Sequence, residues 1–220
     1  MDAFAEQEAA GQQHHGGAFP TSVLRDIERL LPGQVAASAE TGCGKSTVLL
    51  SNLSAHHTPF CLDDRDAPEG SVGFYARCSL TRLERVHPVF GPTQATLPAY
   101  SHPHGYDIVL LDGPHAWPFP DIEYWHFYPH IRTGGYLLVD DVGIPTIGRM
   151  ADIIAEDAMW DLVAVISTTA VFRRTEAPTF DPFGDGWWIQ PFNQRRVHPD
   201  HPAHSAAAGP RDLVTSRIPQ

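Results

Sequence analysis

The chain has 220 residues, a formal net charge of −11 and 42% hydrophobic residues, which fits one domain with a sizeable core. The acidic balance argues against a general nucleic-acid or anionic-membrane binder, because binding to phosphates requires clustered Lys and Arg. No apolar run reaches the ~18–20 residues of a membrane-spanning helix, and no signal peptide is recognisable. We therefore expect a cytoplasmic protein with reduced cysteines.

The predicted elements alternate between strands and helices along the chain. Short apolar runs predict strands over 34–38, 59–62, 89–90, 107–111 and 136–139. Helical spacing of apolar residues predicts helices over 21–31, 46–53 and 122–131, with a helical crossover over 65–87. Continuous apolar strands separated by helices indicate a parallel sheet that is covered on both faces.

The two ends of the chain have a different composition from its middle. Residues 1–20 are rich in Ala, Gln, His and Gly, and we expect them to be disordered. The runs 162–172 and 187–192 are predicted to form an antiparallel pair of strands. From 195 onward Pro, His, Ala and Gly predict a flexible tail, so that a single domain is expected over 21–194.

Residues 39–47 read Ala-Glu-Thr-Gly-Cys-Gly-Lys-Ser-Thr and match two different kinds of loop. In a phosphate-binding P-loop, the backbone wraps phosphates, a Lys adds charge and a Ser binds magnesium. Lys45 and Ser46 would supply the last two groups, and Asp112 would be the magnesium-associated acid. Against this interpretation, an Ala replaces the usual first Gly, and Glu40 would repel the phosphates.

The same residues also fit a loop that holds S-adenosylmethionine (SAM). Gly42 and Gly44 allow the backbone to approach a ligand closely, and the helix that follows offers its positive N-terminal end. The positive helix end suits the carboxylate of SAM. The amine and the sulfonium of SAM suit a nearby acid such as Glu40. After the second strand, Asp63, in preference to Asp64, is placed to accept both ribose hydroxyls.

Three motifs in order carry a family resemblance: Glu-Thr-Gly-Cys-Gly-Lys-Ser-Thr at 40–47, Tyr-Asp-Ile-Val-Leu-Leu-Asp-Gly-Pro-His at 106–115, and Gly-Gly-Tyr-Leu-Leu-Val-Asp-Asp at 134–141. Together they resemble class I SAM-dependent methyltransferases, more narrowly the small bacterial branch whose fourth strand ends in Asp-Gly-x-His. The resemblance covers roughly residues 36–192. It implies an α/β fold with a doubly wound Rossmann-like sheet, mostly parallel with an antiparallel strand near the C-terminus.

A fourth match concerns the adenine end of SAM. Residues 91–94, Gly-Pro-Thr-Gln, are similar to the Gly-x-Ser-Gln turn with which catechol-type O-methyltransferases contact adenine. The resemblance implies this role for Thr93 and Gln94, and an ordinary Gly-Pro turn is the alternative. Ser46 at the helix start and Asp112 complete the predicted cofactor contacts.

The acids at the ends of the fourth and fifth strands are candidate metal ligands. In catechol-type enzymes the equivalent acids bind a magnesium-like ion, and the resemblance places Asp112, Asp140 and Asp141 at these positions. Three carboxylates at neighbouring strand ends form a hard-cation site that suits Mg, Ca or Mn. Metal-free methyltransferases also keep acids at these strand ends, so both alternatives stay open.

His115 lies where the catechol-type enzymes place a catalytic lysine. An imidazole can deprotonate a substrate hydroxyl near pH 7 without the large pKa shift that a lysine needs. His115 is therefore the predicted general base, with Asp112 beside it in the catalytic group. A metal ligand and a loop histidine bonded to the backbone are the alternatives.

These residues predict a SAM-dependent methyltransferase that acts on a hydroxyl of a small-molecule acceptor, with SAM as cofactor and Mg²⁺ or another divalent cation as an optional one. A metal-free N- or O-methyltransferase, a P-loop NTPase using Lys45 and Ser46, and a SAM-binding scaffold remain alternatives. No nucleic-acid or membrane partner is expected, and a homodimer is left open.

Overall fold

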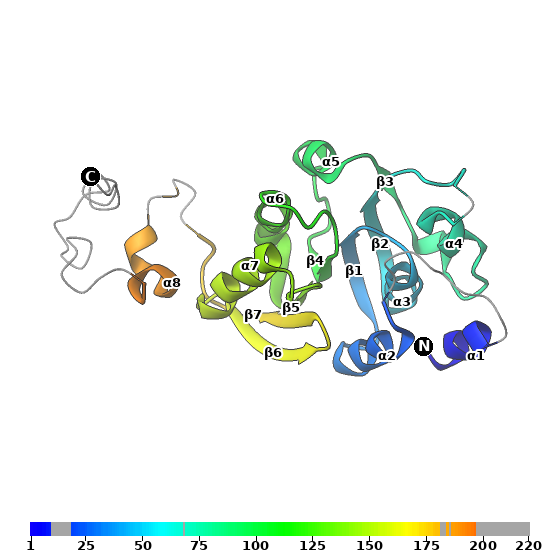
Figure 1. Cartoon of the computed structure of the whole chain (residues 1–220), viewed down its shortest axis with the longest axis horizontal. Coiled ribbons are helices and arrows are strands. Elements are labelled where there is room, and N and C mark those ends of the chain that lie inside the picture. Colours follow the sequence, from blue (N-terminus) through cyan, green and yellow to red (C-terminus); the bar gives the residue numbers. More distant parts are fainter. Residues whose placement is uncertain (10–18, 68, 181–183, 185, 197–220) are drawn as a thin grey trace.

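The computed structural model describes residues 1–9, 19–67, 69–180, 184 and 186–196. Within them, one sheet of seven strands forms the centre of the molecule (Figure 1). The strands are β1 Val35–Thr41, β2 Ser54–Cys61, β3 Val89–Phe90, β4 Tyr106–Leu111, β5 Ile131–Val139, β6 Trp160–Ile166 and β7 Thr169–Arg174. Their order across the sheet is β3-β2-β1-β4-β5-β7-β6.

The sheet is parallel from β3 to β5 and ends in an antiparallel hairpin. β1 pairs in parallel with β2 and β4, and β4 pairs in parallel with β5. β7 runs antiparallel to both β5 and β6. The predicted fold class, a doubly wound and mostly parallel α/β sheet with an antiparallel strand near the C-terminus, is therefore confirmed.

Helices cover both faces of this sheet. The helices of the described residues are α1 Asp2–Ala9, α2 Thr21–Leu30, α3 Lys45–Leu53, α4 Ser71–Arg77, α5 Thr93–Ala99, α6 Phe119–Phe127, α7 Pro145–Glu156 and α8 Pro191–Gln194, with short 3₁₀ turns at Leu83–Arg85, Tyr128–His130 and Trp187–Ile189. Of these, α1 contacts α2, and α8 contacts α7 and the last 3₁₀ turn. No helix of the described part of the chain is long and apolar enough to cross a bilayer.

The apolar run of β4 explains why both faces are covered. Val109 and Leu111 pack into one core with residues of α5, α6 and α7. Ile108 and Leu110, which point to the opposite face, pack into a second core with α2 and α3. A strand that is buried on both faces reads as continuous apolar sequence, which is why the sequence predicted β4 correctly.

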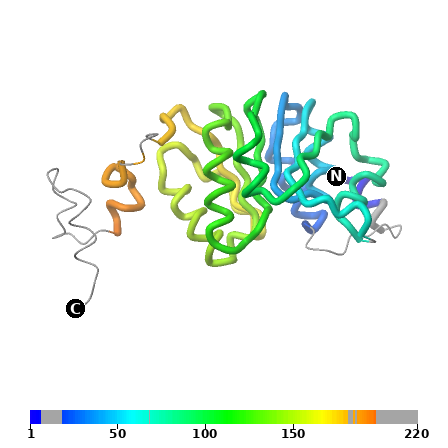
Figure 2. The backbone as a smooth tube through the Cα atoms, turned by 90° about the horizontal axis from the view of Figure 1, so that it is seen from above, coloured from blue at the N-terminus to red at the C-terminus, as the bar shows by residue number. Residues whose placement is uncertain are grey.

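The strand order reverses between β1 and β4, and this reversal positions the candidate site. β2 and β3 continue outward from β1 on one side, whereas β5, β7 and β6 continue from β4 on the other. Figure 2 shows the chain divided accordingly, with the blue and cyan N-terminal part at one end and the green and yellow part at the other. In such sheets, ligands bind beyond the carboxyl ends of the strands at the point of reversal.

The predicted pairing of 162–172 with 187–192 as two antiparallel strands is wrong. Residues 162–172 contain most of a complete hairpin, with β6 and β7 joined at Ser167–Thr168. Residues 187–192 are not a strand but belong to a 3₁₀ turn and α8. The hairpin was missed because its tight turn carries no Gly or Pro, and Ser167 supplies the positive φ of 57° instead.

The N-terminus also differs from the expected disorder of residues 1–20. Residues 2–9 form α1, and Phe4 is 3% exposed. Its ring packs edge-on against Phe74 at 6.2 Å, in a small cluster between α3 and α4. Residues 10–18, and 197–220 of the predicted C-terminal tail, lie outside the described residues.

Candidate functional site

The glycine-rich loop connects the end of β1 to α3, beside the end of β4. Gly42 has φ 82° and Gly44 has φ 147°, in the region that side chains disfavour. A Cβ on Gly42 would lie 2.6 Å from the carbonyl oxygen of Asp112, so only glycine lets β1 and β4 approach this closely at their ends. Gly42 is therefore required by the packing of the loop against the end of β4.

Glu40 is the last buried acid before this loop. The strand extends to Thr41, so Glu40 lies within β1, and it is fully buried. Its Oε1 accepts hydrogen bonds from Thr47 of α3 and from His57 Nε2 at 3.1 Å. Its Oε2 is buried with no hydrogen-bond partner among the described residues.

Asp63 and Asp64, just beyond β2, have different surroundings. Asp64 accepts hydrogen bonds from the backbone N–H groups of Ser71 at 2.7 Å and Val72 at 2.8 Å, so it caps the start of α4. Asp63 is exposed and pairs with Arg65, whose Nε lies 2.7 Å from Oδ1. Hydrogen bonds from Arg65 lower the pKa of Asp63. Of the two acids, Asp63 is the one that a ligand can reach.

Thr93 and Gln94 form the first turn of α5, beyond the end of β3. The chain turns sharply before them, since Gly91 has φ 138°. Thr93 is 5% exposed, whereas Gln94 is exposed. Both follow the carboxyl end of β3, on the same side of β1 as Asp63.

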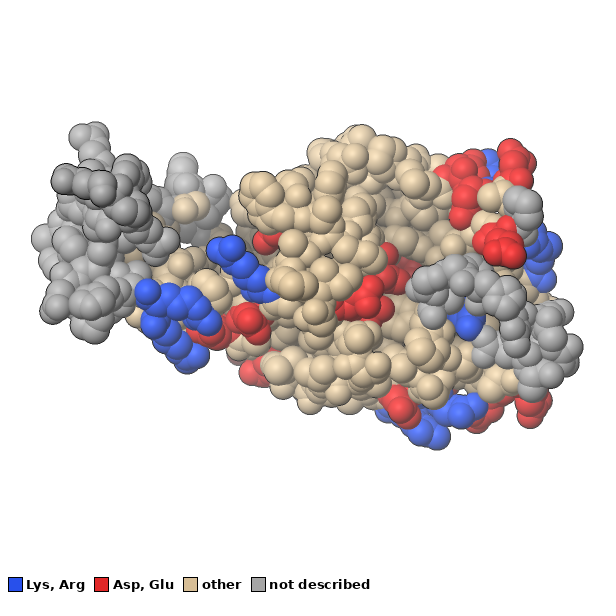
Figure 3. All heavy atoms as spheres, in the orientation of Figure 1, with Lys and Arg blue, Asp and Glu red and all other residues tan. Residues whose placement is uncertain are grey.

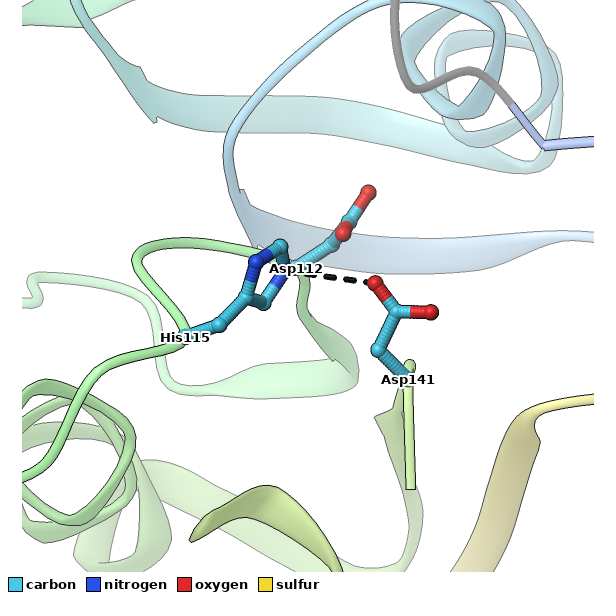
Figure 4. A group of neighbouring side chains, drawn as sticks. All are labelled: Asp112, His115 and Asp141. Carbon is cyan, nitrogen blue, oxygen red and sulfur yellow. Dashed lines mark ion pairs between the residues drawn. The ribbon is translucent and has the colours of Figure 1, made fainter. Parts of the chain in front are cut away.

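Asp112, His115 and Asp141 converge beyond the ends of β4 and β5. One possible ligand atom from each lies within 4.8 Å of the other two. His115 Nε2 is 3.3 Å from Asp141 Oδ2, and the two side chains point toward one another (Figure 4). The loop that carries His115 is fixed by Thr146 of α7, whose hydroxyl donates to the His115 carbonyl at 2.6 Å.

Two features of this group are typical of functional sites: the raised pKa of Asp112 and the backbone conformation of Asp141. Burial, and then the nearby charges of Asp140, Glu40, Asp141 and Glu123, raise the pKa of Asp112 to about 9. Asp141 has a left-handed backbone with φ 56°, which is uncommon for a residue with a side chain and concentrates at functional positions. Figure 3 shows acidic side chains gathered near the centre of one face, surrounded mainly by uncharged residues.

The grouping of the acids differs from the predicted metal set of Asp112, Asp140 and Asp141. Asp140 is 9% exposed, and its Oδ1 accepts hydrogen bonds from Thr169 at 2.6 Å and Thr168 at 3.1 Å. The start of β7 therefore holds Asp140, while His115 occupies the third place in the group. The sequence could not rank the two neighbouring acids because the hairpin that engages Asp140 was not predicted.

Glu123, on α6, is a residue at the site that sequence reasoning missed. It is 1% exposed and accepts a hydrogen bond from Thr41 Oγ1 at 2.8 Å, and Thr41 Oγ1 in turn accepts from the Asp112 N–H at 3.0 Å. A Cβ on Gly113 would lie 2.1 Å from Oε1 of Glu123, so the two residues are in close contact. The signal available in the sequence was an acid between Ile122 and Tyr124, in the middle of a helix rich in aromatic residues.

Known methyltransferases resemble this chain over the residues that form the candidate site. A family model described as a methyltransferase domain matches residues 39–142, which include the glycine loop and the acids after β4 and β5. No curated protein matches the chain.

Three solved structures share the fold. The cofactor-bound structure of Rv0187 from MTB is 17% identical with a TM-score of 0.60, and the match covers 80% of this chain and 91% of that one. An O-methyltransferase from Bacillus cereus in complex with SAH is 17% identical with a TM-score of 0.58, covering 80% and 89%. The O-methyltransferase TomG from Streptomyces achromogenes, in complex with SAM, is 18% identical with a TM-score of 0.54, covering 72% and 82%. The predicted resemblance to class I SAM-dependent methyltransferases is confirmed, and the fold is that of SAM-dependent O-methyltransferases.

Proposed function

We propose that this protein is a methyltransferase that moves the methyl group of SAM to a hydroxyl of a small-molecule acceptor. One observation carries the proposal: the glycine loop after β1 and the group Asp112, His115 and Asp141 meet at the same strand ends. A cofactor held by the loop would therefore present its methyl group toward the imidazole and carboxylates. A methyltransferase domain over 21–194 and a cytoplasmic location are part of the same proposal.

SAM is assigned to the region beyond the carboxyl ends of β1, β2 and β3. Gly42, Gly44 and the start of α3 at Ser46 offer a close backbone and the positive end of a helix to the carboxylate of SAM. Glu40 is placed for the cationic part of the methionine moiety, since its Oε2 is buried with no partner among the described residues. Asp63 would accept the ribose hydroxyls, in competition with Arg65.

The adenine is assigned to the first turn of α5, where Thr93 and Gln94 would border it. The support is positional: this turn follows β3, which pairs with β2 directly before Asp63. Substitution of Thr93 and Gln94, followed by calorimetric titration with SAM, tests these roles.

Methyl transfer is an in-line displacement, and positioning supplies most of its acceleration. His115 would take the proton of the acceptor hydroxyl, while an oxygen lone pair forms the new bond to the methyl carbon. The electrons of the broken carbon–sulfur bond stay on sulfur, which becomes the neutral thioether of S-adenosylhomocysteine. Asp141, at 3.3 Å from Nε2, would stabilise the imidazolium that forms.

Asp112, His115 and Asp141 also fit a divalent cation. Two carboxylates and an imidazole, together with the raised pKa of Asp112, mark a place where added positive charge would relieve repulsion. The oxygen-rich set suits Mg²⁺ or Mn²⁺. When bound, such an ion would lower the pKa of the acceptor hydroxyl. Metal-free N- or O-methylation by the same residues is the alternative.

The NTPase alternative has weaker support. Lys45 is 8% exposed as the first residue of α3, and the buried Glu40 lies beside the loop that would hold phosphates. A nucleotide phosphate at this loop would therefore meet a carboxylate in low dielectric, which is strongly unfavourable.

Calorimetric titration with SAM, and separately with ATP and Mg²⁺, tests the proposal. We expect heat of binding with SAM and with S-adenosylhomocysteine, and none with ATP. Gly42→Val should abolish SAM binding because its Cβ would meet the Asp112 carbonyl, whereas Lys45→Ala should leave SAM binding unchanged. Binding of ATP without binding of SAM would refute the proposed function.

A further inference from the structure

Five polar side chains form a buried line between the sheet and the glycine loop. Ser54 and His57 lie on β2, Ser38 and Glu40 on β1, and Thr47 on α3. Each is fully buried, with an exposed fraction of 0%. Burial of polar groups is unfavourable unless they are hydrogen-bonded, so a line of five requires that each finds partners.

The hydrogen bonds determine which nitrogen of His57 carries the proton. Ser54 Oγ donates to Ser38 Oγ at 2.6 Å. The single hydroxyl proton of Ser38 is then directed to His57 Nδ1, which lies at 2.8 Å and acts as the acceptor. A neutral imidazole with an accepting Nδ1 carries its proton on Nε2, and Nε2 donates to Glu40 Oε1 at 3.1 Å.

The line reaches the cofactor loop through Thr47. Its hydroxyl donates to the same Glu40 Oε1 and accepts a hydrogen bond from the Gly44 N–H at 2.9 Å. Glu40 Oε1 therefore has two donors, one from β2 and one from the helix behind the loop. These two donors fix the rotation of the carboxyl group.

Fixing Oε1 leaves Oε2 as the oxygen that has no donor. It is buried and without a hydrogen-bond partner among the described residues. A buried oxygen of this kind is unfavourable unless a ligand supplies a donor. The ammonium group of SAM is a donor of suitable charge.

We propose that His57 is a positioning residue for SAM: it does not touch the cofactor but holds Glu40 so that Oε2 faces the ligand. The inference rests on the proposed function. Replacement of His57 removes one of the two donors to Oε1 and lets the carboxyl group rotate, so SAM should bind more weakly. The acceptor lies at the β4 and β5 ends, so its KM should stay unchanged.

The test compares the SAM dissociation constants of full-length variants with that of the wild type by calorimetry. His57→Phe keeps the volume and removes both hydrogen bonds, and we expect at least tenfold weaker binding. His57→Gln keeps a donor toward Glu40 and should recover most of the affinity. His56→Phe is the matched control, because this neighbour on β2 stacks on His87, outside the buried line. In a Glu40→Gln background, His57→Phe should have no further effect.

The outcomes separate this inference from the proposed function. If the wild-type protein does not bind SAM, the proposed function fails. If it does, and a folded His57→Phe variant binds SAM as tightly, only the role of His57 is refuted. Should His57→Phe not fold, His57→Gln and Ser38→Ala decide: two- to fivefold weaker binding by Ser38→Ala supports the role, and wild-type affinity in both refutes it.

Discussion

Glu123 is a buried carboxyl group with no salt-bridge partner among the described residues. Burial raises its pKa from 4.5 to about 7, and the hydrogen bond from Thr41 offsets part of this rise. It lies against Gly113, directly after Asp112, and so supports the loop that carries the candidate base. Its protonation state changes close to neutral pH, which makes stability depend on pH there.

We expect this dependence to have a defined sign. Between pH 4.5 and 7 the folded state binds the proton of Glu123 more tightly than the unfolded state, so stability falls as pH rises through this window. At about 1.4 kcal/mol per pKa unit, the full loss is roughly 3 kcal/mol. Glu123→Gln cannot ionise and should lack this part of the loss.

Urea unfolding at pH 5 and pH 8 measures the effect. The gain in unfolding free energy from Glu123→Gln should be larger at pH 8 than at pH 5. Glu84→Gln serves as the control, since Glu84 is exposed. An equal effect of Glu123→Gln at both pH values would contradict the raised pKa.

At the scale of single residues, sequence could predict acids at strand ends but not buried partners. Asp63, Asp112 and Asp141 follow apolar strands, and parallel topology brings such ends to one edge. The register between β1 and β2 places His57 beside Ser38 and Glu40. The packing of α6 against Gly113 places Glu123 at the site. Neither contact has a signature in local sequence.

Among the elements, α4 depends on one side chain at its start. Asp64 accepts hydrogen bonds from the N–H groups of Ser71 and Val72, which have no helical acceptor. Asp64→Ala should therefore destabilise the protein by about 1 kcal/mol, as loss of an N-terminal cap does. Its effect on SAM affinity should be small.

The neighbouring acid gives the opposite result and is the matched control. Asp63 is exposed and bonds only Arg65 among the described residues, so Asp63→Ala should leave stability within about 0.5 kcal/mol. SAM affinity should fall at least tenfold, through loss of the ribose contacts. Denaturant unfolding and calorimetry on both variants measure the two effects, and a reversed pattern would exchange the roles of the acids.

Element prediction succeeded where both sides of an element are buried and failed near the C-terminus. β4 and β5 read as apolar runs that end in acids, and α3 follows an evident glycine loop. β6 exposes Leu162, Val163 and Val165, so alternation did not mark it as a separate strand. Aromatic and branched residues at Trp187–Ile189 predict a strand, but this segment forms a 3₁₀ turn.

For the molecule as a whole, the proposed SAM site and the proposed acceptor site meet where the strand order reverses between β1 and β4. The half with β1, β2 and β3 carries the groups assigned to SAM, and the half with β4 and β5 carries those assigned to the acceptor. Gly42 and Asp112 meet at the boundary. The proposed methyl transfer across this boundary would require the two halves to remain in register, which the adjacent parallel strands β1 and β4 provide.

A divalent cation at Asp112, His115 and Asp141 would bind the folded protein alone and so raise its stability. The gain is about 2.7 kcal/mol at a hundredfold excess over Kd. We expect Mg²⁺ or Mn²⁺ to raise the thermal midpoint of the wild type, and EDTA to reverse the rise. Asp141→Asn should abolish the shift, and Asp161→Asn, an exposed position on β6, should not.

Asp140→Asn then distinguishes two ligand sets. Because Thr168 and Thr169 already donate to Asp140, this substitution should retain most of the cation shift, whereas a set built from Asp112, Asp140 and Asp141 would lose it. His115→Ala should weaken the shift if the imidazole is a ligand and leave it intact if His115 acts as the base. An unchanged midpoint of the wild type at saturating Mg²⁺ and Mn²⁺ would favour metal-free transfer, in which His115 alone takes the proton of the acceptor.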